Sequence, residues 1–287
     1  MVSVKNIPFS RKDISHVKFT QRITALCASL LVAVSLSQAP QAAAGERNLV
    51  AFGDSVLADP QLDVYLSSRL GSSNRNPSLD CPSGNNYAKR VASKLGMPVA
   101  DFSCSGAVSM SQGPQMNAQV DDAIRRGALS PDTQRVLYAG GFNDTYNNAQ
   151  LSDADMRARF VGANAPIINK IRAAAPNARI QIVGYPTIGS GDRYCLLHFG
   201  PKPADATALP MVQRYENVTQ WMQVDLAHAT GTEFVDMKPM TWDRGMCADA
   251  NKRLWAGLVD FSAGPGNLPL HINARGHEFV ANHLASF

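Results

Sequence analysis

Short apolar runs alternate with longer amphipathic stretches from residue 45 to the C-terminus, and this alternation predicts strands separated by helices. The expected strands are 49–52, 99–102, 134–139, 179–184 and 233–236. The expected helices are 85–95, 115–126, 153–175, 211–229 and 273–285, and we expect 153–175 to bend or break near Pro166. Because strands joined through helices pair in parallel, the pattern predicts an α/β fold with a parallel sheet covered on both faces.

The first of these strands ends abruptly at a candidate reactive group. The apolar run 49–52 is followed by Gly53-Asp54-Ser55, which puts a serine at the carboxyl end of the strand. Open α/β sheets bind ligands at that edge, and a glycine lets the backbone turn sharply enough for a hydroxyl to point out of the sheet. Gly-Asp-Ser is also an ordinary turn sequence. Ser55 therefore becomes a candidate nucleophile only if partners for it follow other strands.

Residues 1–44 have the pattern of an export signal. A basic leader is followed by an apolar run of 14 residues at 23–36, and then by the small residues Ala42-Ala43-Ala44. A membrane-spanning helix needs about 20 apolar residues. Cys27 lies near the start of the run, which argues against lipid attachment there. We expect cleavage near Ala44, a secreted or cell-envelope location, and no membrane span after cleavage.

Without this segment the chain has no net charge. The whole chain contains 27 Lys+Arg and 23 Asp+Glu; residues 1–44 hold five of the former and one of the latter, which leaves 22 of each in 45–287. The basic character belongs to the leader and gives no reason to expect a nucleic-acid partner. Residues 45–287 suit one large domain, which we expect to be a monomer.

Four cysteines follow the expected cleavage site: Cys81, Cys104, Cys195 and Cys247. An even number in an exported protein favours two disulfides, and three pairings are possible. We favour Cys81–Cys104 and Cys195–Cys247, because each bond would tie down a loop near one face of the sheet. No Cys-x-x-Cys pair is present, which argues against a zinc site.

Candidate partners for Ser55 follow the other strands. His271 precedes the last predicted helix, where a parallel sheet would return the chain to the end of the first strand, and histidine is the usual base at neutral pH. Gly106 follows the second strand, and its N–H can approach a ligand closely. Asn143 follows the third, and its amide can donate to an oxyanion. For the other histidines we expect pocket lining (His198), a structural role (His277) and surface positions (His228, His283).

Three long connections, 56–84, 186–209 and 238–270, each follow a predicted strand. Long loops in compact domains are usually functional. Because all three leave the same edge of the sheet, we expect them to gather around Ser55.

The ordered set of these motifs resembles the SGNH (GDSL) hydrolase family across nearly all of residues 45–287. The matching motifs are Gly53-Asp54-Ser55, Gly106, Gly141-x-Asn143-Asp144 and His271-x-Asn273-x-x-Gly276-His277. Exported, disulfide-bearing actinobacterial lipases and esterases look most similar. The resemblance implies a flavodoxin-like three-layer α/β/α fold and an ester-cleaving serine hydrolase. It also implies Ser55 as nucleophile, His271 as general base, and the N–H groups of Ser55 and Gly106 with the Asn143 amide as the oxyanion hole.

One position departs from the family pattern. The family usually has an aspartate three residues before the catalytic histidine, and that position is Leu268 here. The resemblance includes relatives in which a backbone carbonyl orients the imidazole, and we expect the Leu268 carbonyl to do so. Asp260 is the alternative orienting group.

These features together predict an exported carboxylic-ester hydrolase that needs no metal or organic cofactor. The expected substrate is an acyl ester, either a lipid or an acylated glycan. An acyltransferase that moves the acyl group to a sugar or lipid hydroxyl would use the same residues and is the first alternative. A non-catalytic module that binds cell wall or lipid is the second, although it would not require the whole set of serine, histidine and donors.

Overall fold

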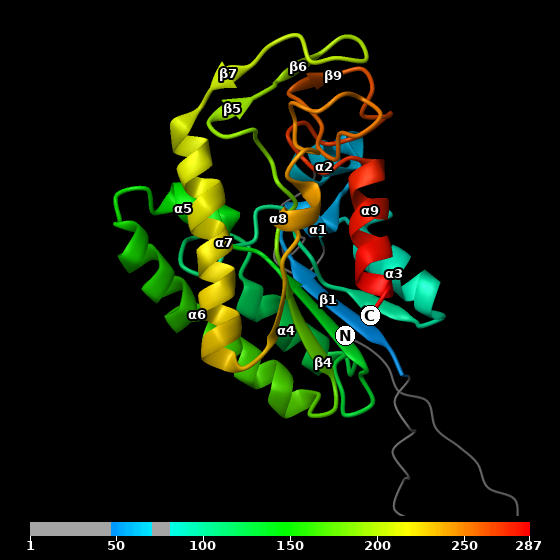
Figure 1. Ribbon diagram of the computed structural model, residues 1–287. Helices are drawn as coiled ribbons and strands as arrows, with labels where there is room; N and C mark the ends of the chain where they lie inside the picture. Colours follow the sequence, from blue (N-terminus) through cyan, green and yellow to red (C-terminus); the bar gives the residue numbers. More distant parts are fainter. Residues whose placement is uncertain (1–46, 71–80) are drawn as a thin grey trace, which may run out of the picture. The chain divides into compact units, whose positions relative to one another are not determined.

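The computed structural model describes residues 47–70 and 81–287, which form a sheet of five parallel strands with helices on both faces (Figure 1). The strands are β1 (Leu49–Gly53), β2 (Val99–Asp101), β3 (Arg135–Ala139), β4 (Arg179–Val183) and β8 (Glu233–Val235). Their order is β2-β1-β3-β4-β8. In register, Val50 lies between Ala100 and Val136. The five predicted strands and the flavodoxin-like order are thus confirmed.

Alternate side chains along the strands pack against two different layers of helices. Val50 and Phe52 point into a core that is closed by α4 (Met116–Arg125), α6 (Asp153–Ala174) and α7 (Pro210–Thr230). Leu49 and Ala51 point into a second core, closed by α3 (Tyr87–Leu95) and α9 (Ala274–Ala285). Both layers are visible in Figure 1, with α6 and α7 on one side of β1 and α3 and α9 on the other. The central strands β1 and β3 are buried along their whole length, as expected for a sheet covered on both faces.

The predicted break in the longest amphipathic stretch is wrong. Residues 153–174 form one helix with Pro166 inside it. Proline removes one helical hydrogen bond. Ile167, Ile168 and Ile171 lie directly after it and are buried in the core. Packing of this apolar face keeps the helix continuous past the proline.

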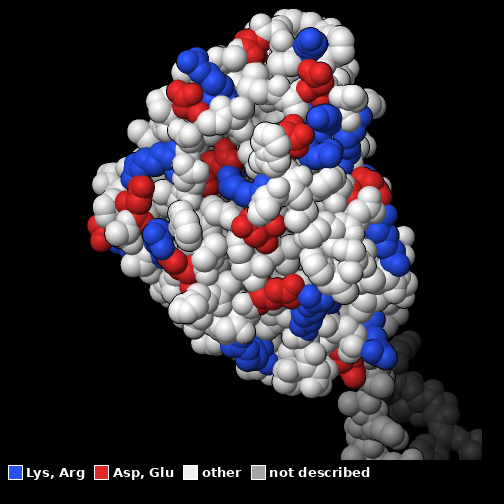
Figure 2. All heavy atoms as spheres, viewed as in Figure 1, with Lys and Arg blue, Asp and Glu red and all other residues white. Residues whose placement is uncertain are grey.

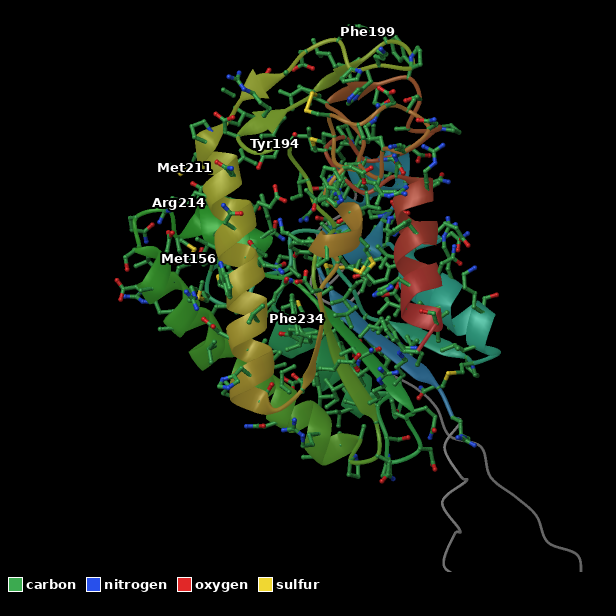
Figure 3. The ribbon with its side chains drawn as sticks, in the orientation of Figure 1. Met156, Tyr194, Phe199, Met211, Arg214 and Phe234 are labelled. Carbon is green, nitrogen blue, oxygen red and sulfur yellow. A yellow bond between two sulfur atoms is a disulfide. The ribbon has the colours of Figure 1, made fainter. Side chains whose placement is uncertain are left out.

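Charged side chains hold α6 against α7. Nε of Arg214 lies 2.7 Å from Asp153 Oδ1, and its Nη2 donates to the Leu151 carbonyl at 2.7 Å. Further along, Arg157 pairs with Asp225 at 2.7 Å. Figure 3 shows Arg214 and Met156 in the space between the two helices. This layer is therefore a rigid support for the loops that emerge above it.

The connections at the carboxyl edge of the sheet carry short elements of their own. These are α1 (Ser55–Ala58), α2 (Leu62–Leu70), α5 (Phe142–Asn147), α8 (Lys238–Thr241), β5 (Arg193–Tyr194), β6 (Leu197–His198), β7 (Thr207–Ala208) and β9 (Val259–Asp260). Strand β5 pairs with β7, and β6 pairs with β9. The connections after β4 and β8 are thereby joined to each other.

Both favoured disulfides are present: Cys81–Cys104 and Cys195–Cys247. The second links the connection after β4 to the connection after β8. The proposed export signal, residues 1–44, lies outside the described residues. Within the described part of the chain, no helix combines the length and the apolar character needed to cross a membrane.

Candidate active site

Ser55 is the first residue of α1, directly after β1. The Asp54 carboxylate caps this helix by accepting the Val56 N–H at 2.9 Å. A side chain on Gly53 would lie 2.6 Å from the Ala139 carbonyl oxygen, so only glycine lets β1 approach β3 this closely before the turn. The sharp turn puts Ser55 at the point where the chain order of the strands reverses, between β1 and β3.

Gln119 of α4 secures the end of β1, and the sequence pattern did not reveal this role. Its Oε1 accepts the Gly53 N–H at 2.9 Å, and its Nε2 donates to the Gly53 carbonyl at 2.9 Å. Gln119 is fully buried. Both hydrogen bonds fix the backbone of Gly53, which precedes Asp54-Ser55. The position of the serine therefore depends on a side chain of α4, a helix that covers one face of the sheet.

His271 is oriented by the carbonyl of Pro269, not by that of Leu268 as predicted. Nδ1 of the imidazole lies 2.8 Å from the Pro269 oxygen, while the Leu268 carbonyl accepts from Asn267. Leu270 has a positive φ of 64°. This conformation reverses the chain within two residues and turns the Pro269 carbonyl back toward the ring. A carbonyl does orient the histidine, but one residue later than expected.

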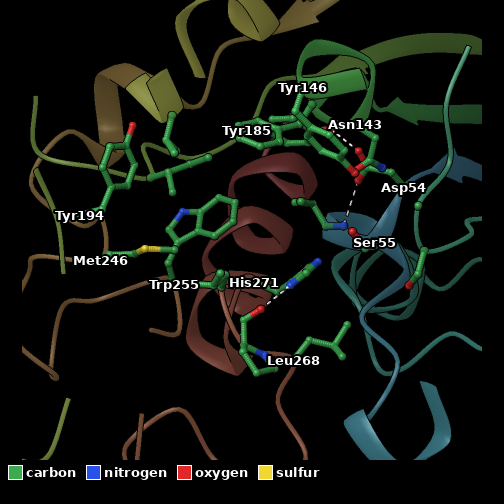
Figure 4. A pocket seen from close by; sticks show the side chains of 18 of the residues that line it. Asp54, Ser55, Asn143, Tyr146, Tyr185, Tyr194, Met246, Trp255, Leu268 and His271 are labelled. Atoms are coloured by element: carbon green, nitrogen blue, oxygen red, sulfur yellow. Dashed lines mark hydrogen bonds between the residues drawn. The ribbon is translucent and has the colours of Figure 1, made fainter. Parts of the chain in front are cut away.

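Ser55 and His271 face the same pocket, and Figure 4 shows the imidazole turned toward the serine. The contact with Pro269 requires a proton on Nδ1, which leaves Nε2 free to accept a proton. Burial lowers the pKa of His271 below 6.5, the Pro269 carbonyl and the charge of Asp59 oppose this shift, and His277 adds to it. The imidazole is therefore neutral at pH 7, as a general base must be.

Two backbone N–H groups and one side-chain amide converge on this pocket. The N–H groups of Ser55 and Gly106 have no hydrogen-bond partner among the described residues. Gly106 has a φ of 82°, which favours glycine. The Asn143 Nδ2 donates one hydrogen to the Ala107 carbonyl at 2.9 Å, and its Oδ1 accepts from Tyr146 at 2.9 Å. These bonds fix the amide and leave its second hydrogen available.

Two buried carboxylates support the loops that carry these donors. Burial raises the pKa of Asp54 to about 6, although Tyr185 and the Val56 N–H donate to it. Burial also raises the pKa of Asp144 to about 6, against the effect of the Met110 and Ser109 N–H groups. Asp144 thereby ties α5, which contains Asn143, to the loop that follows Gly106.

The pocket has a volume of about 500 Å³ and is lined mainly by apolar and aromatic side chains (Figure 4). All five predicted site residues line it: Ser55, Gly106, Asn143, Leu268 and His271. Each of the three long connections contributes to its walls, as predicted. Tyr65 comes from the first, Tyr194 from the second and Trp255 from the third. A mostly apolar cavity with few convergent polar groups is typical of a small-molecule site.

Glu216 of α7 organises one wall of this pocket, and no sequence signal singled it out. It is buried, and it accepts the Ile188 N–H at 2.9 Å, the Gly189 N–H at 3.2 Å and the Tyr194 hydroxyl at 2.9 Å. Lys238 neutralises its charge. One carboxylate on a rigid helix thus shapes the connection that follows β4.

His198 does not line the pocket, contrary to expectation. It is fully buried, with Nε2 at 2.9 Å from the Met246 carbonyl and Nδ1 at 3.2 Å from Asp260. Burial and the charge of Arg253 lower its pKa. His277 is structural, as predicted: its Nδ1 accepts the Tyr87 N–H at 3.2 Å and its Nε2 lies 3.2 Å from Asp59.

Asp260, the alternative orienting group, does not contact His271. Its carboxylate lies 3.3 Å from the guanidinium of Arg253 and accepts from Ser262 at 2.7 Å. Arg253 and Asp260 are both almost fully buried. Asp260 therefore belongs to a structural network beneath the pocket wall.

We predict that Asp260→Ala lowers stability rather than catalysis. It would leave the buried Arg253 without its carboxylate, which should lower the free energy of unfolding by about 3–5 kcal/mol, while kcat of the folded protein stays within about tenfold. Urea denaturation and steady-state kinetics would measure the two effects. Asp243→Ala is the control, since its ion pair with Lys252 is solvent-exposed and should contribute less than about 1 kcal/mol. A loss of kcat of about 10³-fold or more in folded Asp260→Ala would overturn this assignment.

The strand order and the pocket at its reversal point define a doubly wound α/β protein with a serine and a histidine at the ligand-binding edge of its sheet. A model of the GDSL-like Lipase/Acylhydrolase family matches residues 51–279, and the chain belongs to this family. It is accordingly a carboxylic-ester hydrolase.

Two relatives come from Streptomyces, in agreement with the predicted resemblance. Lipase 2 of Streptomyces coelicolor is 25% identical in an alignment 227 positions long, which covers 69% of this chain and 74% of that protein. The crystal structure of phospholipase A1 from Streptomyces albidoflavus NA297 aligns with a TM-score of 0.54 and 19% identity, over 83% of this chain and 99% of that one. This structural similarity supports the α/β fold described above.

Proposed function

We propose that this protein is an exported lipase or esterase that works through an acyl-enzyme on Ser55, with His271 as the general base. One observation carries the proposal. A serine and a neutral histidine face a single apolar pocket. Three N–H donors that follow β1, β2 and β3 face the same pocket, and each has a hydrogen without a partner among the described residues. A nucleophilic acyl transfer needs this set of groups in one place.

In the proposed reaction, His271 accepts the proton of the Ser55 hydroxyl as its oxygen attacks the ester carbonyl. The N–H groups of Ser55 and Gly106 and the free N–H of Asn143 stabilise the oxyanion. His271 then protonates the leaving alkoxide, and the acyl group remains on Ser55. In the second half, His271 removes a proton from water as the water oxygen attacks the acyl-enzyme. His271 then returns the proton to the Ser55 oxygen as the bond to the acyl group breaks and the acid is released.

The Pro269 carbonyl keeps the proton of His271 on Nδ1 throughout this cycle. It thereby supplies the orienting part of the role that a carboxylate has in a three-residue triad, but it carries no full charge. The charge of Asp59 acts on His271 and raises its pKa. Asp59 also pairs with His277 at 3.2 Å.

Export is the second part of the proposal. It is supported by the leader sequence and by the two disulfides, which persist mainly in oxidising compartments. Expression of the full chain with N-terminal sequencing of the extracellular protein would test it. We expect a mature start close to Gly45. Retention of residues 1–44 in a cytoplasmic product would contradict export.

Labelling with a fluorophosphonate probe tests the catalytic part directly. We expect the probe to modify one site, which mass spectrometry should locate on Ser55. Hydrolysis of p-nitrophenyl esters of increasing acyl length would then show how much of the apolar pocket an acyl chain occupies. A fully active enzyme that is not labelled at Ser55 would refute the proposed nucleophile.

Asn143→Ala should lower kcat by about 10²–10³ with little change in KM, because the amide donates mainly to the oxyanion of the transition state. Asn148→Ala is a suitable control, since Asn148 bonds to Ser111 and the Asp144 carbonyl and lies outside the pocket lining. Steady-state kinetics on one ester would compare the two variants. An effect of Asn143→Ala on KM alone would make Asn143 a substrate-positioning residue.

A further inference from the structure

Arg69 of α2 lies at the rim of the pocket, beside the turn that contains Gly106. Its Nη2 donates to the Ser105 carbonyl at 2.9 Å, and its guanidinium lies over the Tyr65 ring, 5.3 Å from the ring centre. Ser105 and Tyr65 both line the pocket, and Arg69 itself is exposed to solvent. These contacts hold a positive charge at the pocket entrance.

The cation lies close to the proposed oxyanion donor. A Cβ placed on Gly106 would be 3.4 Å from Nη2 of Arg69. Two covalent bonds of about 1.5 Å separate that position from the Gly106 nitrogen, so Nη2 lies within about 6.5 Å of the N–H. An ester whose carbonyl oxygen binds this N–H would therefore bring atoms a few bonds away within reach of Arg69.

No carboxylate of the described residues neutralises Arg69. Asp63 lies on the same helix but does not pair with it, and the carboxylate of Asp54 is buried and bonded to Tyr185. On the face shown in Figure 2, charges of both signs are interspersed. Recognition of a charged substrate would depend on local cations, and Arg69 is available for it.

We infer that Arg69 forms a subsite for an anionic group on the alcohol part of the ester, and that the preferred substrates are acyl esters of phosphorylated alcohols. This inference rests on the proposed function. In a 2-acylglycerol 3-phosphate, five bonds separate the carbonyl carbon from phosphorus, a span of roughly 6 Å, which is long enough to extend from an ester at the Gly106 N–H to Arg69. A guanidinium presents paired N–H donors that fit phosphate oxygens.

The surroundings of Arg69 favour an acyl ester over a small polar metabolite. Helix α2, which contributes Leu62 and Tyr65 to the pocket, also exposes Leu66 and Leu70, with 47% and 86% of their surface accessible. Exposed apolar side chains beside a pocket entrance commonly mark an interaction surface. An apolar pocket, an apolar rim and one cation suit a molecule with an acyl chain and an anionic head.

Three matched soluble esters test the inference on the purified protein. They are 1,2-dibutyrylglycerol, its 3-phosphate, and 2,3-dibutyryloxypropanoate, which carries a carboxylate closer to the esters. We would measure kcat/KM for the natural protein, Arg69→Gln and Arg69→Lys. Arg159→Gln is the control for loss of an exposed arginine on α6. Thermal unfolding would verify that each variant is folded.

We expect Arg69→Gln to reduce kcat/KM for the phosphate ester by roughly 5- to 30-fold more than for the uncharged ester. Arg69→Lys should keep part of the preference, and Arg159→Gln should keep all of it. Equal losses on all three esters would show that Arg69 only supports the Gly106 turn, and would overturn the inference. A larger loss on the carboxylate ester than on the phosphate would overturn the choice of phosphate.

The natural protein alone provides a second test if Arg69→Gln does not fold. Its preference for the phosphate ester over the uncharged ester should decrease several-fold as sodium chloride rises from 0.02 to 0.5 M, because salt screens exposed charges. The absence of any preference at low salt would overturn the inference. Failure to hydrolyse any of the three esters would instead count against the proposed function, so the two failures are distinguishable.

Discussion

Ser55→Ala is expected to lower kcat/KM for ester hydrolysis by about 10⁴- to 10⁶-fold, because it removes the hydroxyl on which the proposed acyl-enzyme forms. The Ser55 hydroxyl makes no hydrogen bond to another described residue, so its removal should leave the fold intact. Hydrolysis of p-nitrophenyl butyrate and loss of fluorophosphonate labelling would measure the effect, and circular dichroism would monitor folding.

Ser105→Ala is the matched control for this prediction. Ser105 lines the same pocket, and its buried hydroxyl has no partner within the described part of the chain. If Ser55 is the nucleophile, Ser105→Ala should retain activity within about tenfold. A folded Ser55→Ala protein with more than about one per cent of the original activity would refute the proposed mechanism, and a reversed pattern would assign the reaction to Ser105.

His271→Ala should reduce kcat/KM by about 10³- to 10⁵-fold, since the serine then has no base and the leaving alkoxide has no acid. The exposed His228 provides the control, and His228→Ala should behave like the natural protein. The same ester assay serves both variants. A reduction of less than tenfold in folded His271→Ala would exclude it as the base.

The pH profile of the natural protein tests the state of His271 independently. The neutral imidazole is the active form, so kcat/KM should rise with pH through the pKa of His271 and level off above it. Burial lowers that pKa from 6.5, hence the midpoint of the rise should fall below 6.5. A midpoint above 7 would mean that a carboxylate raises the pKa of the histidine after all.

The fold and most of the candidate site could be predicted because they depend on local patterns. Apolar runs of strand length separated by amphipathic stretches permit few arrangements, and parallel pairing follows from the helical connections. Ser55, Gly106 and Asn143 each follow a strand directly. The topology of the sheet therefore brings all three to the same edge.

Contacts between distant segments were decided only by the tertiary structure. The positive φ of Leu270 selects the Pro269 carbonyl over that of Leu268, and a dihedral angle leaves no trace in apolar periodicity. His198 is buried because it contacts the Met246 carbonyl and Asp260. Both belong to the connection after β8, which begins some 40 residues later in the chain. Ion pairs and hydrogen bonds between segments far apart in the chain depend on packing, and no local pattern encodes them.

The sequence by itself determined the layers, the strand order and the residues that meet at the end of β1, since these follow from periodicity and from the family motifs. Only the tertiary structure decided which groups hold these residues in place. Gln119 bonds to Gly53 and the Pro269 carbonyl bonds to His271. Glu216 holds the connection after β4, and Arg69 lies beside Gly106 and bonds to Ser105. The physical reason is that each such contact joins a side chain or carbonyl to a partner whose position is set by several elements at once. Its geometry is defined only when all of those elements are packed.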